Sequence, residues 1–433
     1  MSIYKMKYGK KYVEFEFDDQ NVLNVIKPNQ LNLPDLSGRE CVVEALENPI
    51  ASARLCEIVK SGDTVCVVVP DITRVWQSPN IYVPPIIEEL NRGGVRDEDI
   101  LIISATGSHR SQTDDEYKQL VSEDIFNRIK MIDHDSKDED NLVYCGMTTY
   151  GTPVKLNKKA LECDHLVLAG GAIYHFLAGF GGGRKYVMPG IAGYDTIMTN
   201  HSYSFNKGLG SGSNENVKSG NMSDTNPVHC DMMEAASFAN PTFILNVVVS
   251  SDKKITHAFS GNYIKAHEAA CKIVEAVDGV EIEEKAEMVI ASACGFPKDI
   301  NLYQTSKTLF NVVEAIKPDG VIIILSECSE GFGSEATEYM MTKFDNMLDR
   351  EKDIRAKYSI GKGIAYLECD YAEKYTFILV SEMDADQLKN TKIKSVKTID
   401  EALELAYSIK GTRNLKTIMM PDGANTQPIF TGE

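Results

Sequence analysis

Long apolar runs are missing from this 433-residue sequence, and their absence excludes one class of protein. No stretch reaches the roughly 18 consecutive apolar residues that a membrane-spanning helix needs. The first residues, MSIYKMKYGKKYVEFEF, alternate and carry charge, so they lack the apolar segment of a secretory signal. We therefore expect a cytoplasmic protein without a membrane partner.

Basic residues are also in short supply. Lys and Arg number 45 against 63 Asp and Glu, which gives a formal net charge of −18. No stripe of clustered basic residues interrupts this acidic balance. Because proteins that bind nucleic acids neutralise phosphates with an excess of Lys and Arg, a nucleic-acid partner is excluded.

Paired cysteines are absent too, since the ten cysteines are scattered and none forms a C-x-x-C pair. This pattern argues against a cysteine-type zinc site and favours reduced thiols that fill the core. Histidine is scarce, with eight residues in all. We interpret five of them as surface or packing residues: His134, His165, His229, His257 and His267.

What the sequence does contain is a repeated α/β pattern. Continuous apolar runs at 64–71, 99–109 and 163–175 are typical of buried parallel strands, and amphipathic helical segments separate them. A second unit of this kind starts near residue 286. We predict an α/β fold with two α/β domains, mostly parallel sheets and an active-site cleft between them. The predicted domains are 1–280, completed by a returning strand in 413–433, and 286–412.

Polar residues gather where these predicted strands end, which is where open α/β sheets bind ligands. Asp71, Thr73 and Arg74 follow the first run, and His109 follows the second. His175 follows the third and opens the stretch HFLAGFGGGRKYVMPGIAGYDTIMTNH, which closes on His201. This stretch matches neither the G-x-x-x-x-G-K-[ST] phosphate loop nor a G-x-G-x-x-G fingerprint. Its glycines either allow close backbone approach or expose N–H groups to a phosphate. Several cations among few carboxylates indicate a small anionic ligand.

Four segments in the same order resemble the nickel-pincer lactate racemase family: PDITR (70–74), GSHR (107–110), the 175–201 stretch and FPKDINLYQTSK (296–307). The resemblance implies nickel held in a pyridinium-3,5-bisthiocarboxylate mononucleotide. His109 and His175 match the paired acid/base residues, and His201 matches the protein ligand to nickel. Lys185 matches the residue that attaches or contacts a thioacid arm of the cofactor. The remaining matches are Asp71, Ile72, Thr73 and Arg74 in a cofactor loop, Gln304 and Lys307 in the second domain, and Arg74 with Lys307 as the pair that holds the substrate carboxylate.

Elementary chemistry agrees with these implied roles. The C2 hydrogen of a 2-hydroxy acid is scarcely acidic, so inversion by loss of a hydride to give a keto acid is easier than inversion by loss of a proton. No side chain accepts a hydride, and a cofactor must therefore do so. The hydroxyl proton leaves at the same time, and histidine, with a pKa of about 6.5, suits both directions of that transfer.

The sequence thus predicts an isomerase that racemises or epimerises a 2-hydroxy acid, with the small-molecule acid and cofactor biosynthesis proteins as partners and a homo-oligomer as one possible state. Two alternatives stay open: a non-redox lyase or dehydratase in the same cleft, and a catalytically silent protein that binds the cofactor. Which hydroxy acid is used, and whether Lys185 is linked covalently, also stay open. The polar 202–227 segment is either a flexible surface loop or a lid or oligomer contact.

Overall fold

The computed structural model describes residues 1–30, 36–250 and 252–432, and the chain divides into two compact units. We call Leu31–Tyr203 with Asn216–Glu275 the central unit. The terminal unit holds both ends of the chain and consists of Met1–Gln30, Ser204–Glu215 and Ala276–Glu433. Among the described residues, no helix has the length and apolar character to cross a membrane.

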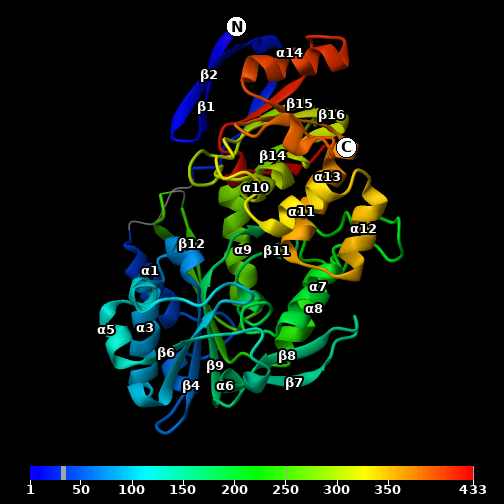
Figure 1. The fold of residues 1–433 in the computed structure, drawn as a ribbon. Coiled ribbons are helices and arrows are strands. Elements are labelled where there is room, and N and C mark those ends of the chain that lie inside the picture. Colours follow the sequence, from blue (N-terminus) through cyan, green and yellow to red (C-terminus); the bar gives the residue numbers. More distant parts are fainter. Residues whose placement is uncertain (31–35, 251, 433) are drawn as a thin grey trace. The chain divides into compact units, whose positions relative to one another are not determined.

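The central unit is built on a six-stranded sheet with the order β13-β12-β9-β4-β5-β6 (Figure 1). Neighbouring strands are parallel, except that β12 and β13 are antiparallel. Strand β4 reads VCVVVP and is buried at every residue, as expected for a strand covered on both faces. The strands are β4 (Val65–Pro70), β5 (Ile100–Ala105), β6 (Lys130–Asp133), β9 (His165–Gly171), β12 (Phe243–Val249) and β13 (Ile255–Gly261).

Helices cover both faces of this sheet. On one face, alternate strand residues such as Val67 pack against Ile86 of α3. On the other face, Val248 of β12 packs against Val274 of α9 and Phe180. The helices are α1 (Gly38–Glu47), α2 (Leu55–Ile58), α3 (Pro79–Arg92), α4 (Asp114–Val121), α5 (Glu123–Arg128), α6 (Lys158–Leu161), α7 (Tyr194–Ser202), α8 (Pro227–Ser237) and α9 (Lys265–Asp278). Two small antiparallel pairs are β7 (Leu142–Met147) with β8 (Pro153–Asn157), and β10 (Tyr174–His175) with β11 (Gly179–Phe180).

The terminal unit contains a second six-stranded sheet, with the order β18-β17-β16-β15-β19-β3, in which all neighbours are parallel. Cover on both faces explains the apolar, buried centres of this sheet, such as VIIIL at the end of β16 and FILV in β17. The strands are β3 (Val22–Val25), β15 (Ala286–Ser292), β16 (Ile316–Leu325), β17 (Thr376–Val380), β18 (Lys394–Val396) and β19 (Thr417–Met420).

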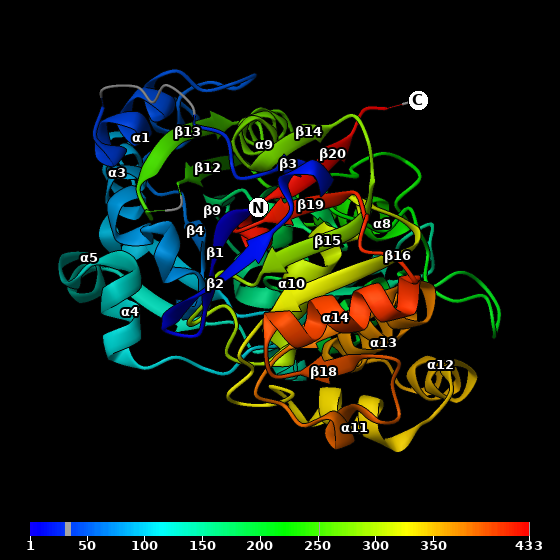
Figure 2. The ribbon, with the colours of Figure 1, turned by 90° about the horizontal axis from the view of Figure 1, so that it is seen from above.

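Different elements pack against the two faces of the terminal sheet. Val289 points to a core shared with α10 to α13, whereas Met288 points to a core shared with the β1–β2 hairpin and α14. The hairpin and α14 lie over the same side of β15 and β16 (Figure 2). The covering elements are β1 (Ser2–Tyr8), β2 (Lys11–Phe17), α10 (Leu302–Val312), α11 (Glu335–Lys343), α12 (Met347–Ala356), α13 (Ile360–Lys374) and α14 (Ile399–Lys410). Two α/β units with mostly parallel sheets confirm the predicted fold class.

The placement of both chain ends corrects the predicted domains. We predicted residues 1–280 as one domain with a strand in 413–433 returning to it. Instead, β19 lies between β15 and β3 in the terminal sheet, and β20 (Gln427–Phe430) pairs with β14 (Gly279–Ile282). The hairpin also buries Met6 and Phe15 in the terminal unit. An apolar run predicts a buried strand, but it does not reveal which sheet supplies the neighbours.

The polar segment after α7 also belongs partly to the terminal unit. Phe205 lies in the core of that unit, with its ring 4.9 Å from that of Tyr366. Arg355 donates to the Asn206 carbonyl at 2.8 Å, and Ser213 donates to Asp370 at 2.7 Å. Residues 204–215 are therefore anchored by specific contacts, which a composition rich in Gly, Ser and Asn does not suggest.

Candidate active site

The loop after β4 carries the first group of predicted residues. Asp71 precedes the short 3-10 helix η2 (Ile72–Gln77), which begins where the strand ends. The Thr73 hydroxyl donates to Asp71 Oδ1 at 2.6 Å, and Arg74 Nη1 donates to Thr73 Oγ1 at 3.0 Å. Asp71 is buried, whereas Thr73 is exposed and Arg74 is partly buried. The predicted cofactor loop is thus a connected polar segment, with a carboxylate at its base.

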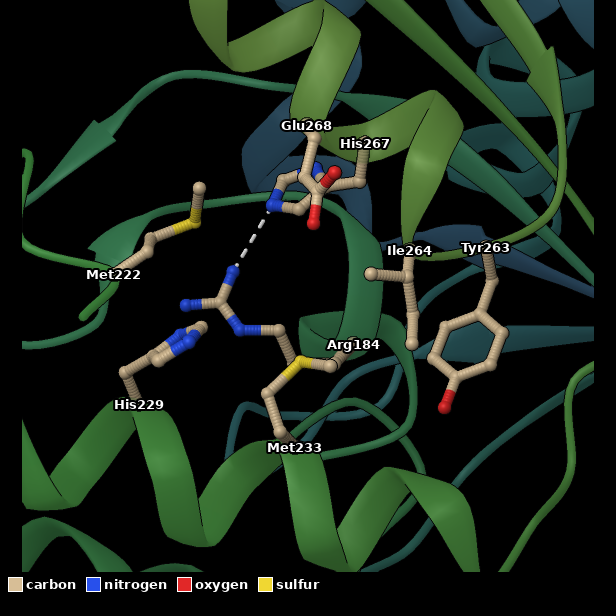
Figure 3. A pocket seen from close by; sticks show the side chains of 8 residues that line it. All are labelled: Arg184, Met222, His229, Met233, Tyr263, Ile264, His267 and Glu268. Carbon is tan, nitrogen blue, oxygen red and sulfur yellow. Dashed lines mark hydrogen bonds between the residues drawn. The ribbon is translucent and has the colours of Figure 1, made fainter. Parts of the chain in front are cut away.

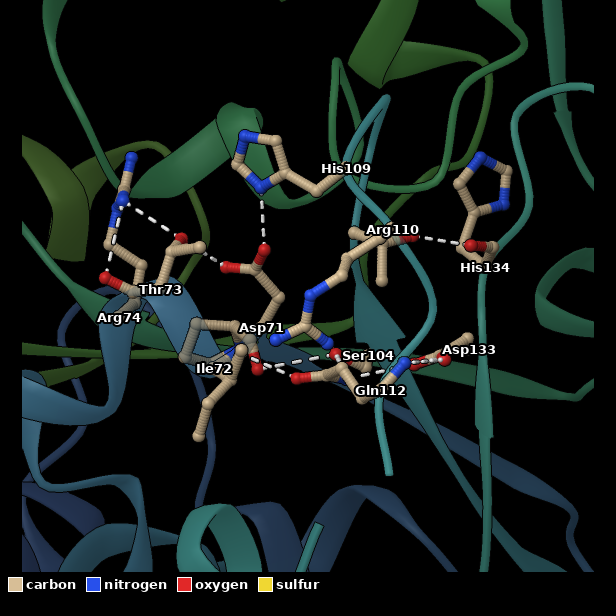
Figure 4. Close-up of polar contacts among 12 residues, drawn as sticks. Asp71, Ile72, Thr73, Arg74, Ser104, His109, Arg110, Gln112, Asp133 and His134 are labelled. Atoms are coloured by element: carbon tan, nitrogen blue, oxygen red, sulfur yellow. Dashed lines mark hydrogen bonds and ion pairs between the residues drawn. The ribbon is translucent and has the colours of Figure 1, made fainter. Parts of the chain in front are cut away.

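His109 lies beside this loop and pairs with its carboxylate (Figure 4). Its Nδ1 is 2.5 Å from Asp71 Oδ2, while half of the His109 side chain remains exposed. Burial raises the pKa of Asp71, but the hydrogen bonds from His109 and Thr73 outweigh this effect and leave the pKa below its usual value. An ionised Asp71 accepts the Nδ1 proton, so the hydrogen-bond network assigns the lone pair of His109 to Nε2.

His175 has the opposite hydrogen-bonding pattern. Two backbone N–H groups, those of Leu177 and Ala178, donate to its Nδ1 at 3.2 Å each. Its Nε2 is 2.9 Å from Lys185 Nζ. Because Nδ1 accepts, a neutral His175 carries its proton on Nε2, facing the lysine. Burial among protein atoms, followed by the charge of Lys185, lowers the pKa of His175 well below its usual value.

Lys185, the residue that contacts His175, belongs to the glycine-rich turn. Burial, followed by the charges of Arg184 and Arg74, lowers the pKa of the Lys185 amine well below its usual value. Gly183, two residues earlier, has a φ of +57°, and a Cβ built on it would lie 2.5 Å from the His267 ring. Glycine is therefore required at this turn by both its dihedral angle and the close approach of a side chain. Of the two roles that the sequence leaves open for the glycines, close approach to another group therefore applies at Gly183.

His201 is the second-to-last residue of α7 and is buried, with 4% of its surface exposed. Its Nδ1–H donates to the Ile197 carbonyl at 2.9 Å, which assigns the ring lone pair to Nε2. Burial, followed by the charge of Lys185, lowers the pKa of His201 to about 3. A neutral imidazole of fixed orientation is the form of histidine that ligates a metal.

These side chains gather around His175. The charges that depress its pKa come from Lys185, His201 and Arg74, together with Arg184. The loop after β4, the glycine-rich turn and α7 therefore bring their predicted residues into one electrostatic neighbourhood in the central unit. The remaining two predicted residues, Gln304 and Lys307, lie on α10 of the terminal unit, where Lys307 Nζ is 2.5 Å from Gln304 Oε1. The predicted cleft between the two domains stays a prediction.

Several supporting residues were not predicted from the sequence. Gln112 accepts from the Ile72 N–H at 2.6 Å and donates to Asp133 at 2.8 Å, which fixes the start of η2 (Figure 4). Asn200 donates to the buried Asp231 at 2.8 Å and so ties α7 to α8 beside His201. Gln112 follows β5 in the same loop as His109, so its position at a strand end was a usable signal. No sequence signal distinguishes Asn200 from an ordinary helical residue.

Comparisons with known proteins agree with this arrangement. Profiles of the lactate racemase N-terminal and C-terminal domains match residues 8–212 and 280–426. A lactate racemase of Thermoanaerobacterium thermosaccharolyticum is 32% identical over 98% of this chain and 99% of that protein. A lactate racemase of Lactiplantibacillus plantarum is also 32% identical, over 96% and 97% of the two chains. The solved structure of the T. thermosaccharolyticum lactate racemase apoprotein matches with a TM-score of 0.89 at 30% identity, covering 99% of this chain and 100% of that one.

The fold and the sequence therefore define a racemase-type isomerase. The chain belongs to the lactate racemase family, as the resemblance of its four segments predicted.

Proposed function

We propose that this enzyme racemises lactate or a similar short 2-hydroxy acid with the help of a nickel-pincer nucleotide. The observation that carries the proposal is the pair of oppositely arranged histidines, His109 and His175, on the loops beside Arg74, Lys185 and His201. The relatives that cover the full chain are lactate racemases, which supports lactate as the first substrate to test. The cytoplasmic location and a homo-oligomeric state stay predictions.

The residues of the central unit fit the proposed cofactor. Among residues 1–30, 36–250 and 252–432, no three or more His, Cys, Asp and Glu side chains group together as a metal site. A nickel ion held by His201 therefore needs further donors that a cofactor brings, and soft sulfur arms are suitable ones. Lys185, with a depressed amine pKa, would meet a thioacid arm either as a nucleophile or as a hydrogen-bonding partner. When bound, the cofactor would supply the hydride acceptor that the protein lacks.

The remaining steps fall to side chains of this chain. Arg74 offers a guanidinium for the substrate carboxylate, and Lys307 a second charge. His109 presents the Nε2 lone pair and would accept the hydroxyl proton of one enantiomer. His175 would return a proton to the keto oxygen from its doubly protonated form, which the negative charge of a bound substrate carboxylate would favour, and the ring would be left neutral. In the reverse direction the two histidines exchange roles, so either enantiomer is consumed.

Protein produced together with cofactor biosynthesis proteins tests the proposal. Nickel analysis and mass spectrometry report cofactor loading, and a chiral assay over a panel of 2-hydroxy acids reports racemisation. Substrate deuterated at C2 should keep its label, because the hydrogen is transferred within the enzyme. Loss of the label to water would favour proton abstraction, and loaded protein that is inactive on every acid would favour a cofactor-binding protein.

Three variants test the assignment of residues. His109→Ala and His175→Ala should each lower kcat by about 10²–10⁴ and retain nickel, because an acid/base group contributes on that scale. His201→Ala should lose nickel. Full nickel content in His201→Ala would contradict the ligand assignment.

A further inference from the structure

A cavity of about 90 Å³ adjoins the glycine-rich turn at Arg184. It is enclosed by the turn itself, by α8 and by the first residues of α9 (Figure 3). None of the residues proposed above for catalysis or cofactor binding lines it. Its lining residues are Arg184, Met222, His229, Met233, Tyr263, Ile264, His267 and Glu268.

Arg184 is the cation of this cavity, and only 1% of its surface is exposed. Its Nη1 donates to the Phe180 carbonyl at 3.0 Å and contacts His267 Nε2 at 3.0 Å, and its Nη2 donates to the Ala178 carbonyl. In the part of the chain that the structure describes, no ion pair includes Arg184, and its buried Nε has no hydrogen-bond partner. Burial lowers the pKa of Arg184 to about 10, so the guanidinium is charged at neutral pH. An unmatched buried cation costs several kcal/mol.

A second polar group of the cavity is also unmatched. His229 Nδ1 is buried and has no hydrogen-bond partner among the described residues. Burial, followed by the charge of Arg184, lowers the pKa of His229 to about 3, so the ring is neutral and offers one N–H. In Figure 3 the His229 ring lies next to the guanidinium of Arg184. Glu268, the carboxylate that lines the cavity, does not neutralise the charge of Arg184. It pairs instead with Lys265 at 2.9 Å, and its side chain is 44% exposed.

The walls limit what the cavity can hold. Met222, Met233 and Ile264 are apolar, and an apolar surround strengthens the attraction between a buried cation and an anion. One guanidinium and one neutral imidazole balance a single negative charge. A doubly charged oxyanion would leave an excess charge beside Glu268.

We propose that this cavity is a binding site for a small monovalent anion, such as chloride or a short carboxylate, held by Arg184 and His229. The bound anion offsets the buried charge of Arg184. The same guanidinium holds the Ala178 and Phe180 carbonyls, and Ala178 N–H contacts His175. Anion binding therefore stabilises the loop that carries His175 without contact between the anion and the catalytic histidines. This inference is independent of the substrate and the cofactor proposed above.

Thermal unfolding of the full chain at constant ionic strength tests the site, with chloride, acetate or sulfate replacing benzenesulfonate, an anion that is too large for the cavity and is not a hydroxy acid. Chloride or acetate should raise Tm saturably by about 2 °C or more, because a ligand that binds only the folded state stabilises it. Sulfate should not. A Tm that is indifferent to the anion would overturn the proposal.

Two matched variants and a crystal locate the effect. His229→Leu removes the N–H at similar volume and should abolish the anion-dependent shift, whereas His257→Leu, which removes an imidazole outside the cavity, should keep it. A crystal soaked in bromide should show anomalous scattering within hydrogen-bond distance of Arg184. An unchanged shift in His229→Leu, or bromide only at other positions, would place the binding elsewhere and refute the site.

Discussion

His109 and His175 look equivalent in the sequence, since each follows a predicted strand and matches half of an acid/base pair. The structure separates them. His109 is half exposed and bonded through Nδ1 to a carboxylate, whereas His175 is bonded through Nε2 to an amine and has no carboxylate at either nitrogen. In the proposed mechanism the first would accept a proton at Nε2, and the second, in its imidazolium form, would donate one. A racemase needs this opposition in each direction of turnover, so the asymmetry is informative about mechanism.

The largest expected effect comes from the carboxylate behind His109. Asp71→Asn should lower kcat by about 10²–10⁴, because an amide stabilises the required tautomer and the protonated ring less well. The measurement is kcat of nickel-loaded enzyme, with nickel content determined in parallel. Asp133→Asn removes the same charge from a residue that contacts Gln112 rather than His109, and it should have a smaller effect. A loaded Asp71→Asn enzyme with the original kcat would remove the proposed difference between the two histidines.

The amine beside His175 gives the next prediction. Each unit by which the pKa of Lys185 falls below 10.5 raises its neutral fraction at pH 7 about tenfold, so a low dose of an acylating reagent should modify Lys185 of the cofactor-free protein at least tenfold faster than Lys265. Peptide mass spectrometry over time gives both rates. Arg184→Met removes a charge that lowers this pKa and should slow the reaction at Lys185 alone. Equal rates at the two lysines in the original protein would show that Lys185 is protonated.

Buried histidines predict how stability depends on pH. Burial lowers the pKa of six imidazoles, so below about pH 6.5 the unfolded chain binds more protons than the folded chain, and the free energy of unfolding falls on acidification. The six are His134, His175, His201, His229, His257 and His267. Three carboxyl groups oppose this trend without cancelling it, because burial raises the pKa of Asp278 to about 7, that of Glu368 well above its usual value, and that of Asp231 above its usual value.

Urea unfolding of the cofactor-free protein at pH 7.5 and pH 5.5 measures this dependence. The urea midpoint should be lower at pH 5.5. The free energy of unfolding should fall by about 1.4 kcal/mol per pH unit for each net proton that the unfolded chain binds in excess. His134→Gln, which removes one buried imidazole that has no role in the proposed chemistry, should make the slope shallower. A midpoint that rises on acidification would show that the imidazoles are charged in the folded state.

The smallest effect is expected at Gln112. Gln112→Ala removes the bonds to Ile72, Ser104 and Asp133, and it should lower the free energy of unfolding by about 1–3 kcal/mol. Ser111→Ala, an exposed neighbour, should change it by less than about 0.5 kcal/mol. Denaturant unfolding at neutral pH gives both values. If the two variants behave alike, the support for the loop beside His109 comes from other contacts.

Much of the candidate site was predictable, because strand ends can be read from an apolar run. The runs before Asp71, His109 and His175 contain strands β4, β5 and β9, and His175 itself lies in β10, which pairs with β11 outside the main sheet. All three polar ends belong to the central unit. Gln112 and Asn200 were missed, since their importance depends on partners 40 and 31 positions away along the chain. His229 and His267 were interpreted as surface or packing residues, yet both line the cavity beside Arg184.

By itself the sequence determined the α/β class, the family and the residue types at the strand ends, because periodicity and motif order are local properties of the chain. Only the tertiary structure decided that β19 joins the terminal sheet, that Phe205 is buried in the terminal unit, and that one histidine faces a carboxylate and the other an amine. These pairings join residues that are remote in sequence. Their physical basis is the burial of apolar surface and the satisfaction of polar groups in three dimensions, which no local pattern encodes.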